Sequence, residues 1–393
     1  MISKKLLRIC PICGNGIGEI LYTQKFSFPT ENHLPKHYDV ICCNTCGFVF
    51  ADSSATQKEY DIYYEQLSKY ENEATASGTG ISSYDAERLN QTAREIKKFL
   101  PNKSAKILDV GAANGGLLLA LRKLGYNSLT GMDPSPTCIH KMQSQGLKAV
   151  IGGIFSEVQI NERFDCIVLS HVLEHLYDVR GGIKNLMSLL KDGGILYIEV
   201  PDAALYSQYF IVPFYYFDCE HINHFDESSI RNLLGLFGGT ALEAQSKEIL
   251  VSKNHSYPTL GVFYKKNDRA ASSPILDFTV KQSVLKHIQQ SLATEQGKEF
   301  EKLEKNAMPI IIFGAGQYTQ RLLADTNLKR CNIIAFVDND SKKQGLKLEN
   351  IKIESKEILR DFNGSVVIAS AMHSQEILEE IRAMNVQNSV III

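Results

Sequence analysis

A short apolar run that passes into a glycine-rich turn, residues 106–116, limits the folds open to this chain more than any other segment. It reads Lys-Ile-Leu-Asp-Val-Gly-Ala-Ala-Asn-Gly-Gly, and a helical pattern follows it. A buried strand that leads through glycines into a helix is typical of a βαβ unit. Apolar runs continue to alternate with helical stretches up to about residue 200, which predicts a parallel, doubly wound α/β sheet. The predicted strands are 106–110, 128–132, 164–170 and 194–200.

The glycine turn and the ends of the neighbouring strands supply candidate ligand contacts. Glycines let backbone N–H groups approach a ligand closely, and Asp109 at the strand end can hold the loop or a ligand ammonium group. Asp133 ends the second strand, where an acid can accept hydrogen bonds from both ribose hydroxyls. A NAD-binding turn would usually read Gly-x-Gly-x-x-Gly, and this turn does not. The candidate cofactor-binding residues are Asp109, Gly111, Ala112, Asn114, Gly115, Asp133, Pro134, Ser170 and His171.

An unusual run of aromatic, acidic and histidine residues, 214–225, follows the last of these strands. In a doubly wound sheet ligands lie beyond the carboxyl ends of the strands, so we expect this run to lie over the bound ligand. A His with a neighbouring Glu could abstract a proton there. The alternatives are a lid that only packs, and histidines at 171 and 175 that only cap or pack. The candidate catalytic residues are His221, Glu220, His175, Asp218 and His224.

Five of the nine cysteines fall before residue 47, in a chain too large for a small secreted disulfide scaffold. Four of them form two Cys-x-x-Cys-Gly knuckles, Cys10 with Cys13 and Cys43 with Cys46. The two-residue gap lets both sulfurs of a pair reach one tetrahedral ion, and the glycine permits the tight turn. We therefore predict a structural zinc site with four thiolates, against the alternative of buried cysteines without metal. Cys42 could replace a knuckle cysteine, at a less usual spacing.

A second α/β unit begins near residue 307, with predicted strands at 309–314, 333–338 and 365–369. Its first turn resembles the start of a dinucleotide fold, and the carboxylate of Asp338 follows at the spacing of a ribose contact. Thr319 replaces the third glycine, which disfavours a closely packed NAD pyrophosphate. The same helix start suits the diphosphate of a nucleotide sugar, and a unit that only buttresses the chain is the alternative. The candidate substrate-binding residues are Gly314, Gly316, Gln317, Asp338 and Asn339, with Tyr70 and Tyr84 ahead of the first sheet.

Length and composition complete the organisation. A chain of 393 residues with 44% hydrophobic and 22% charged residues is expected to form several globular domains. The predicted parts are a zinc-binding domain (1–58), the doubly wound domain (59–270), a helical linker (271–306) and a Rossmann-like domain (307–393). The first part reads as irregular and turn-rich, residues 275–305 read as one connecting helix, and two last strands are predicted at 241–248 and 259–265.

The charge of the chain bears on its partners and location. The formal net charge is −2 without a basic block, which disfavours a nucleic-acid partner. No run of about 20 apolar residues suggests a membrane span, and the start of the chain lacks the apolar region of a signal peptide. We therefore expect a cytoplasmic protein with a small-molecule partner, as a monomer or a dimer.

Residues 106–200 resemble a class I S-adenosylmethionine (SAM) dependent methyltransferase. The resemblance rests on the glycine turn, on Asp133, on the run 164–175 and on the Leu-Leu-Lys-Asp-Gly-Gly turn at 189–194, in that order. It implies SAM as cofactor and methyl transfer as the reaction. It also implies that the transferred methyl lies near Ser170 and His171.

Over nearly its full length the chain is similar to the sugar-nucleotide C-methyltransferases of deoxysugar pathways. The matching residues are the cysteine knuckles, Asp109 to Gly115, His175, Glu220-His221 with Phe225, and Val337-Asp338-Asn339 with Lys343-Gln344-Gly345. The resemblance implies a keto-sugar on a nucleoside diphosphate, usually dTDP. It implies that His221 removes a proton next to the ketone, with Glu220 and His175 as polar companions, and that the enolate attacks the SAM methyl.

The chain departs from that family in two places. Asp218 stands where the family usually has Tyr, and the family's Tyr- and Ser-rich segment has no firm match at residues 70–78. O-methylation of a nucleotide sugar or a surface-polysaccharide sugar, in which His221 would deprotonate a hydroxyl, therefore stays open. An RNA methyltransferase with a zinc module and a non-catalytic nucleotide sensor are the remaining alternatives.

Overall fold

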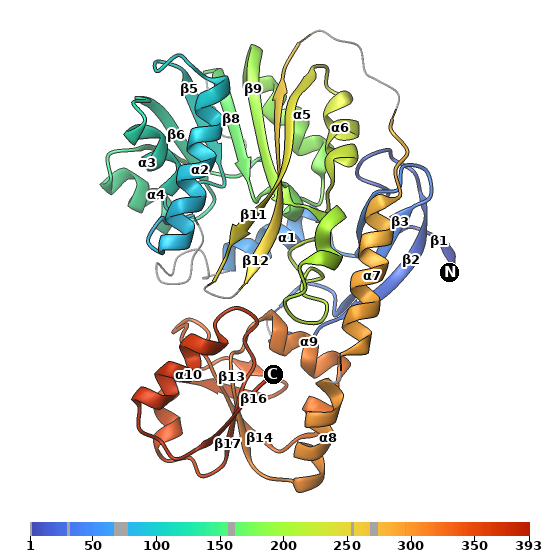
Figure 1. Cartoon of the computed structure of the whole chain (residues 1–393), viewed down its shortest axis with the longest axis vertical. Helices are drawn as coiled ribbons and strands as arrows, with labels where there is room; N and C mark the ends of the chain where they lie inside the picture. The colour runs from blue at the N-terminus through green and yellow to red at the C-terminus, as the bar shows by residue number, and fades with distance from the viewer. Residues whose placement is uncertain are drawn as a thin grey trace.

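The computed structural model describes residues 2–29, 32–66, 78–155, 162–252, 255–267, 274–294 and 296–393. These residues form three sheets (Figure 1). The largest sheet and its helices lie at the top of the view, the amino-terminal sheet lies beside them, and the carboxyl-terminal unit lies below. None of the helices in the described part of the chain is long and apolar enough to cross a membrane.

The amino-terminal segment is an antiparallel sheet of order β1-β2-β3-β4-β10. The expectation of an irregular first part was therefore wrong, because short strands interrupted by two knuckles leave little periodicity to read. Both faces of this sheet are buried: Ile41 and Cys43 pack toward one core, and Val40 and Cys42 toward another. Its strands are β1 (Ser3–Lys5), β2 (Ile17–Lys25), β3 (His37–Cys43), β4 (Val49–Asp52) and β10 (Asn223–His224).

The central sheet has the order β11-β12-β9-β8-β5-β6-β7. The strands from β9 to β7 are parallel, and β12 and β11 complete the sheet in antiparallel pairing. This confirms the doubly wound sheet and its six predicted strands; β7 is an additional edge strand. The strands are β5 (Lys106–Val110), β6 (Ser128–Asp133), β7 (Lys148–Ile151), β8 (Phe164–Ser170), β9 (Leu190–Pro201), β11 (Thr240–Leu250) and β12 (Ser256–Lys265).

Successive side chains of the central strands point to opposite faces of the sheet, and those on both faces are apolar. Helices therefore cover both faces. Cys166 and Val168 of β8 pack into one core, with α2, α3 and α4, while Ile167 and Leu169 pack into the other, with α5 and α6. The second core also takes in the amino-terminal sheet. The helices are α1 (Gln57–Gln66), α2 (Ser83–Phe99), α3 (Gly116–Lys123), α4 (Pro136–Ser144), α5 (Val179–Leu189) and α6 (Glu227–Gly235), with 3-10 turns η1 (Leu173–His175) and η2 (Ala203–Gln208).

The segment predicted as one connecting helix forms two helices. Val284 of α7 packs into the aromatic core around the amino-terminal sheet, whereas Phe300 of α8 packs into the carboxyl-terminal unit. A single straight helix could not serve both cores, which is why the prediction was wrong. The helices are α7 (Thr279–Ala293) and α8 (Gln296–Asn306).

The carboxyl-terminal unit is a six-stranded sheet of order β15-β16-β14-β13-β17-β18. It docks on the amino-terminal sheet: the backbone N–H of Ser27 donates to Gln320 O (3.0 Å), and Gln24 Nε2 donates to Asp325 Oδ2 (2.9 Å). Its strands are β13 (Ile310–Phe313), β14 (Ile333–Val337), β15 (Lys347–Leu348), β16 (Ile351–Glu354), β17 (Ser365–Ile368) and β18 (Ser389–Ile392). Its helices are α9 (Gln317–Asp325) and α10 (Ser374–Ala383), with 3-10 turns η3 (Asn327–Arg330) and η4 (Lys356–Arg360).

Candidate functional site

The two cysteine knuckles converge on one point. Cys10 Sγ lies 3.6 Å from Cys46 Sγ, and Cys13 Sγ lies 3.5 Å from Cys43 Sγ. Four sulfurs at about 2.3 Å from one tetrahedral ion would lie roughly 3.8 Å apart, so the cluster has the size of a zinc site. Cys42 is turned away from it, with its Sγ 3.5 Å from the carbonyl oxygen of Gly47.

The glycine turn after β5 has the shape of a ligand cradle. Gly111 and Gly115 have φ of +72° and +81°, and an added Cβ would lie 2.6 Å from Val172 and 2.8 Å from Met142. Only glycine satisfies both the backbone and the space at these positions. The buried Asn114 side chain, on the same turn, has an Nδ2 without a hydrogen-bond partner in the described structure. The turn therefore fits a ligand that reaches its backbone and accepts from this amide.

Two aspartates end the strands beside the turn. Asp133 Oδ2 accepts from the Ala113 backbone N–H and Oδ1 from the Ser135 backbone N–H, both at 2.9 Å, so this carboxylate shapes the turn. Pro134 follows it, and the Ser135 side chain caps α4. Burial, together with the Asp133 charge, raises the pKa of Asp109 to about 7. A cationic ligand group would favour the ionised form of Asp109.

A buried carboxylate that the sequence did not single out organises the other side of the site. Glu199, at the end of β9, accepts from Ser170 Oγ (3.0 Å) and lies 2.6 Å from Lys247 Nζ. Arg88 Nη1 lies 3.4 Å from the same carboxylate. Burial alone would raise the pKa of Glu199, but His171, Lys247 and Arg88 hold it well below its usual range. The sequence pattern that could have indicated Glu199 was an acidic residue inside an apolar strand. No comparable pattern surrounds Arg88 or Lys247.

His171 lies between two carboxylates at the end of β8. Its Nδ1 is 3.2 Å from Glu174 Oε1, and its Nε2 is 3.5 Å from Glu199 Oε1. Burial would lower the pKa of His171, but these two acids outweigh burial and raise the pKa to about 9. The imidazole is therefore a cation at neutral pH. Its backbone φ of +56° turns the chain sharply at this point.

His221 of the segment 214–225 lies beside His175, a second candidate catalytic residue, and beside Glu174, which was not among the candidates. Ligand-type atoms of Glu174, His175 and His221 lie within 4.8 Å of one another. The His175 and His221 rings meet edge to face at 4.8 Å between centroids. His221 keeps 22% of its side chain exposed, so a small molecule can reach it.

The backbone of this segment is held by its own aspartate. Asp218 Oδ1 accepts from the backbone N–H groups of Glu220 (2.8 Å) and His221 (2.6 Å). The side chain of Glu220 accepts from Tyr63 Oη at 3.2 Å, and His175 Nδ1 lies 3.1 Å from Tyr64 Oη. Asp218 thus shapes the turn, and the tyrosines of α1 contribute to the site without having been predicted.

His224 does not take part in this cluster as a reactive group. It is completely buried on β10, with Nδ1 3.3 Å from Tyr206 Oη and its ring against Phe217. Burial lowers its pKa to about 3, so it is neutral. We correct the expectation of a catalytic role: His224 joins the segment to the amino-terminal sheet through its pairing with Val49.

The glycine turn of the carboxyl-terminal unit faces the same segment. Gly314 has a φ of +110°, and an added Cβ would lie 2.5 Å from the Ala369 carbonyl oxygen. Gly316 caps α9 without a side-chain hydrogen bond, and Gln317 begins the helix. Gln317 Nε2 donates to Glu220 Oε1, which joins the two predicted sites.

The other predicted substrate residues are less well placed. Asp338 Oδ2 accepts from the Ala315 backbone N–H and lies 3.0 Å from Lys343 Nζ. The carboxylate of Asp338 is therefore already hydrogen-bonded to the glycine turn. Asn339 Nδ2 donates to Glu380 Oε2 on α10 at 2.8 Å, and its role as a substrate contact stays a prediction. Tyr84 lies in the first turn of α2 and is partly buried. Tyr70 lies outside the described residues.

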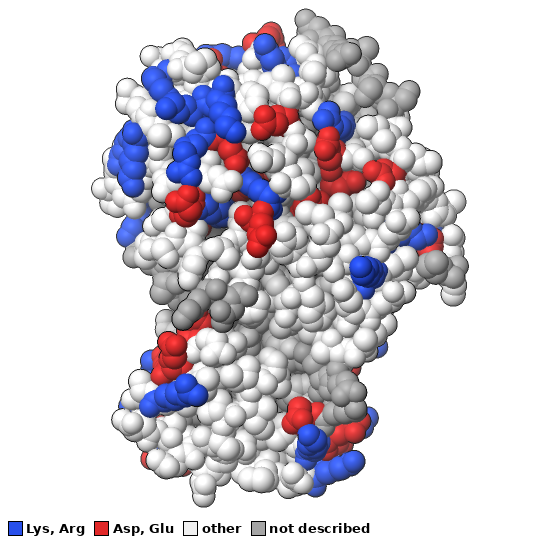
Figure 2. Space-filling model, viewed as in Figure 1, with Lys and Arg blue, Asp and Glu red and all other residues white. Residues whose placement is uncertain are grey.

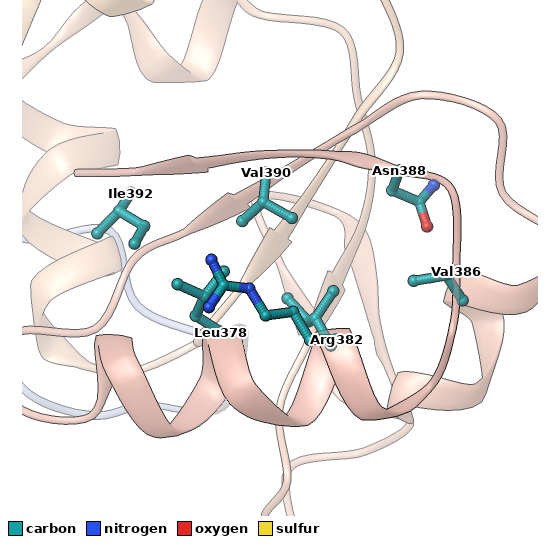
Figure 3. A pocket seen from close by; sticks show the side chains of 7 residues that line it. Leu378, Arg382, Val386, Asn388, Val390 and Ile392 are labelled. Carbon is teal, nitrogen blue, oxygen red and sulfur yellow. The ribbon is translucent and has the colours of Figure 1, made fainter.

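A hollow of about 430 Å³ between α10 and β18 is separate from this site (Figure 3). Its walls carry aliphatic side chains such as Leu378 and Val390, with Arg382 and Asn388 as the polar members. It has no carboxylate, histidine or cysteine in its lining, and we assign no chemistry to it.

Comparison with known proteins identifies the central part. Residues 84–244 match a family described as a methyltransferase domain, and residues 306–392 match one described as C2185-like, N-terminal. The chain therefore contains a methyltransferase domain of the SAM-dependent class in its central part.

Individual relatives agree with this class. A ubiquinone biosynthesis O-methyltransferase of Coxiella burnetii is 30% identical over 152 residues, 37% of this chain and 64% of the relative. An EEF1A lysine methyltransferase 2 of Homo sapiens is 31% identical over 93 residues, 24% of this chain and 38% of the relative. This chain spans less than half the length of the first three curated relatives it matches.

A solved structure aligns with a larger share of the chain. It is the 1,6-didemethyltoxoflavin-N1-methyltransferase of Burkholderia thailandensis, with 1,6-didemethyltoxoflavin and S-adenosylhomocysteine bound. Its TM-score is 0.41 at 18% identity, and the match covers 57% of this chain and 97% of that chain.

Proposed function

We propose that this enzyme methylates a nucleotide-activated keto-sugar on carbon. The observation that carries the proposal is the contact between Gln317 and Glu220, because it sets the cluster of His175 and His221 beside the amino terminus of α9. One end of an extended acceptor could thus lie at α9 while the other lies over the methyltransferase domain. A nucleoside diphosphate sugar has the matching chemistry, an anionic middle and a polar reactive end.

The residues of the cluster are suited to proton abstraction. His221 is partly exposed and turned toward Asp218 Oδ2, 3.9 Å from its Nδ1. As base it takes a proton from the carbon next to the ketone, and the charge moves onto the carbonyl oxygen. Bound SAM supplies an electrophilic methyl group on a positive sulfonium. The cationic His171, at the carboxyl end of β8, is a suitable partner for the developing enolate oxygen.

The glycine turn after β5 and the acids beside it are proposed to hold SAM. Asp133 would accept from the ribose hydroxyls, and Asp109 would face the ammonium group of the methionine part. Ala112 and the orphaned amide of Asn114 lie on the same turn. These contacts bind and orient the donor, and they leave proton transfer to the segment 214–225.

The four knuckle cysteines are proposed to hold one structural zinc ion. All four sulfurs belong to one cluster, and the Thr45 backbone N–H and Asn15 Nδ2 approach Cys43 Sγ at 3.4 and 3.6 Å. Donors of this kind favour a thiolate. A four-thiolate site has no open position, so the ion would stabilise the amino-terminal sheet and take no part in methyl transfer.

Methylation of a sugar oxygen is the second candidate. The same cluster supports it, because His221 could equally deprotonate a hydroxyl. Several of the relatives are O-methyltransferases by name, which favours keeping this candidate.

Carbon NMR with SAM that carries a carbon-13 methyl group distinguishes the two reactions. The enzyme is incubated with a panel of dTDP- and UDP-linked 4-keto sugars, and the product is read by chemical shift. We expect the methyl resonance of a carbon-bound methyl. A methoxy resonance would replace enolate chemistry by hydroxyl deprotonation, and no product from any member would contradict the keto-sugar proposal.

The role of His221 is tested with a matched pair of variants. His221→Gln should bind SAM with unchanged affinity and lose turnover by a factor of about 100 or more, as expected for a lost general base. His140→Gln, an exposed residue of α4, is the control and should keep full activity. Retained turnover in His221→Gln would remove it as the base.

A further inference from the structure

Arg321 is a buried arginine that lacks a counter-ion. Its residue is only 5% exposed, and its Nε has no hydrogen-bond partner. No carboxylate of the described residues lies within ion-pair distance of its guanidinium, and the nearby Asp325 accepts from Gln24 instead. A guanidinium stays charged in proteins, and an unpaired buried charge is strongly destabilising. An anion bound beside the guanidinium would neutralise its charge and remove this cost.

The side chain of Arg321 lies on the face of α9 that contains Gln317. Residues four apart lie on the same face of a helix, and helical side chains lean toward the amino terminus. The guanidinium carbon lies 5.9 Å from the ring centroid of Tyr318, in the first turn, which agrees with that direction. The guanidinium is thus turned toward the start of the helix.

The start of α9 is itself open to an anion. Gly316 caps the helix without a side-chain hydrogen bond, and a Cβ added to it would meet no atom within 4 Å. Helix amino termini bind phosphate through backbone N–H groups and the helix dipole. Arginine adds a planar fork that matches two phosphate oxygens. A buried guanidinium whose Nε has no hydrogen-bond partner and a helix start without a side-chain cap are two independent features that both favour an anion.

Asp325, one turn further along α9, lies close enough for the charge of Arg321 to oppose the rise in the Asp325 pKa that burial causes. Coulombic effects of its charge reach Tyr22 and Tyr38 of the amino-terminal sheet and His287 of α7, all of which are neutral at pH 7. Few charged side chains lie over the middle of the face shown in Figure 2, between the upper and lower parts.

We propose that Arg321 and the amino terminus of α9 bind a phosphoryl group of the acceptor substrate. The inference rests on the proposed function only in taking that acceptor to be a nucleoside diphosphate sugar. Gln317 lies between this phosphate site and Glu220, so a bound diphosphate would set the sugar end toward His221. Arg321 is then the residue that selects diphosphate-linked acceptors over free sugars.

Calorimetric titration with dTDP, UDP and inorganic pyrophosphate tests the site. The comparison is between Arg321→Gln and Arg330→Gln, an identical change at an exposed arginine of η3. We expect the dissociation constant of dTDP or UDP to rise at least about 30-fold in Arg321→Gln and to stay within twofold in Arg330→Gln. SAM affinity, measured on the same samples, should be unchanged and reports that the variant is folded.

A second variant keeps the test decisive if Arg321→Gln does not fold. Arg321→Lys retains the charge without the planar fork and should weaken nucleotide binding by an intermediate factor, about 5- to 10-fold. Affinity equal to that of the parent enzyme in either folded variant would overturn the proposal. So would a parent enzyme that binds neither pyrophosphate nor either nucleotide.

The outcomes separate this inference from the function on which it rests. Binding of nucleotide or pyrophosphate that depends on Arg321, without methylation of any keto-sugar, would support the phosphate site and contradict the sugar reaction. Methylation with an unchanged KM in Arg321→Gln would support the reaction and overturn the phosphate site.

Discussion

Gln317 Nε2, at the first residue of α9, donates a hydrogen bond to Glu220 Oε1, 97 positions earlier in the chain. It joins the carboxyl-terminal unit to the segment that contains His221. Glu220 is buried, and a hydrogen bond to a buried charged group is worth about 1.5–3 kcal/mol. The two α/β units are therefore in direct contact at the candidate site.

Removing this hydrogen bond should slow methyl transfer. In Gln317→Leu we expect a turnover number about tenfold lower, because the buried carboxylate of Glu220, the residue next to His221 in the chain, loses a donor that fixes its position. Steady-state kinetics with saturating SAM measures the effect, and SAM affinity should not change. Gln375→Leu, at an exposed position of α10, is the control. A turnover number equal to that of the parent would show that the contact is only structural.

Loss of one knuckle cysteine should release the metal. Purified protein is expected to contain about one zinc ion per chain by elemental analysis, and Cys13→Ser should contain much less. Its melting temperature should fall by roughly 5–10 °C, because a structural zinc site contributes to folding. Cys42→Ser should keep the metal, since Cys42 points away from the cluster. Full zinc occupancy in Cys13→Ser would refute the four-thiolate site.

Loss of the Asp133 carboxylate should weaken SAM binding. Asp133→Ala removes the proposed acceptor for the ribose hydroxyls and the acceptor that fixes the Ala113 N–H. The dissociation constant of SAM should rise roughly 10- to 100-fold by calorimetry, with circular dichroism unchanged. Asp192→Ala, whose side chain is 82% exposed, should bind SAM as the parent does. Equal affinities in the two variants would argue against the ribose role.

Stability should depend on pH through His171. Because its folded-state pKa is raised from 6.5 to about 9, its charge stabilises the fold fully below pH 6.5, and this contribution is lost as pH rises through 9. His171→Asn tolerates the φ of +56° and removes the cation. The variant should be less stable by about 2 kcal/mol at pH 6 and nearly equal to the parent near pH 10. Urea unfolding at both pH values measures the difference, and a constant difference would contradict the charge argument.

The doubly wound sheet was predictable because its signal is local. Its strands are continuous apolar runs. The turn that follows the first of them needs positive φ values, and Gly111 and Gly115 stand at the positions that adopt them. The cysteine knuckles are equally local, since a two-residue gap brings two sulfurs together wherever it occurs. The amino-terminal strands were missed because they are short and interrupted by the two knuckles, and because the fifth strand of their sheet, β10, comes from far along the chain.

The candidate site was predictable only in part. The His175 and His221 rings lie together, whereas His224, from the same run as His221, is buried in the core, because alternate residues of an extended segment face opposite ways. Arg88 and Lys247 converge on Glu199 from α2 and β11, and neither has a pattern around it that could be read.

The sequence by itself determined the class of the central domain, the turn that fits SAM and the two pairs of cysteines, since each depends on residues adjacent in the chain. Only the tertiary structure decided that four sulfurs form one cluster, that His171 is a cation between Glu174 and Glu199, and that Arg321 is buried without a partner. The physical reason is the same in each case: distances and burial between distant segments set charge and reactivity, and no local pattern encodes them.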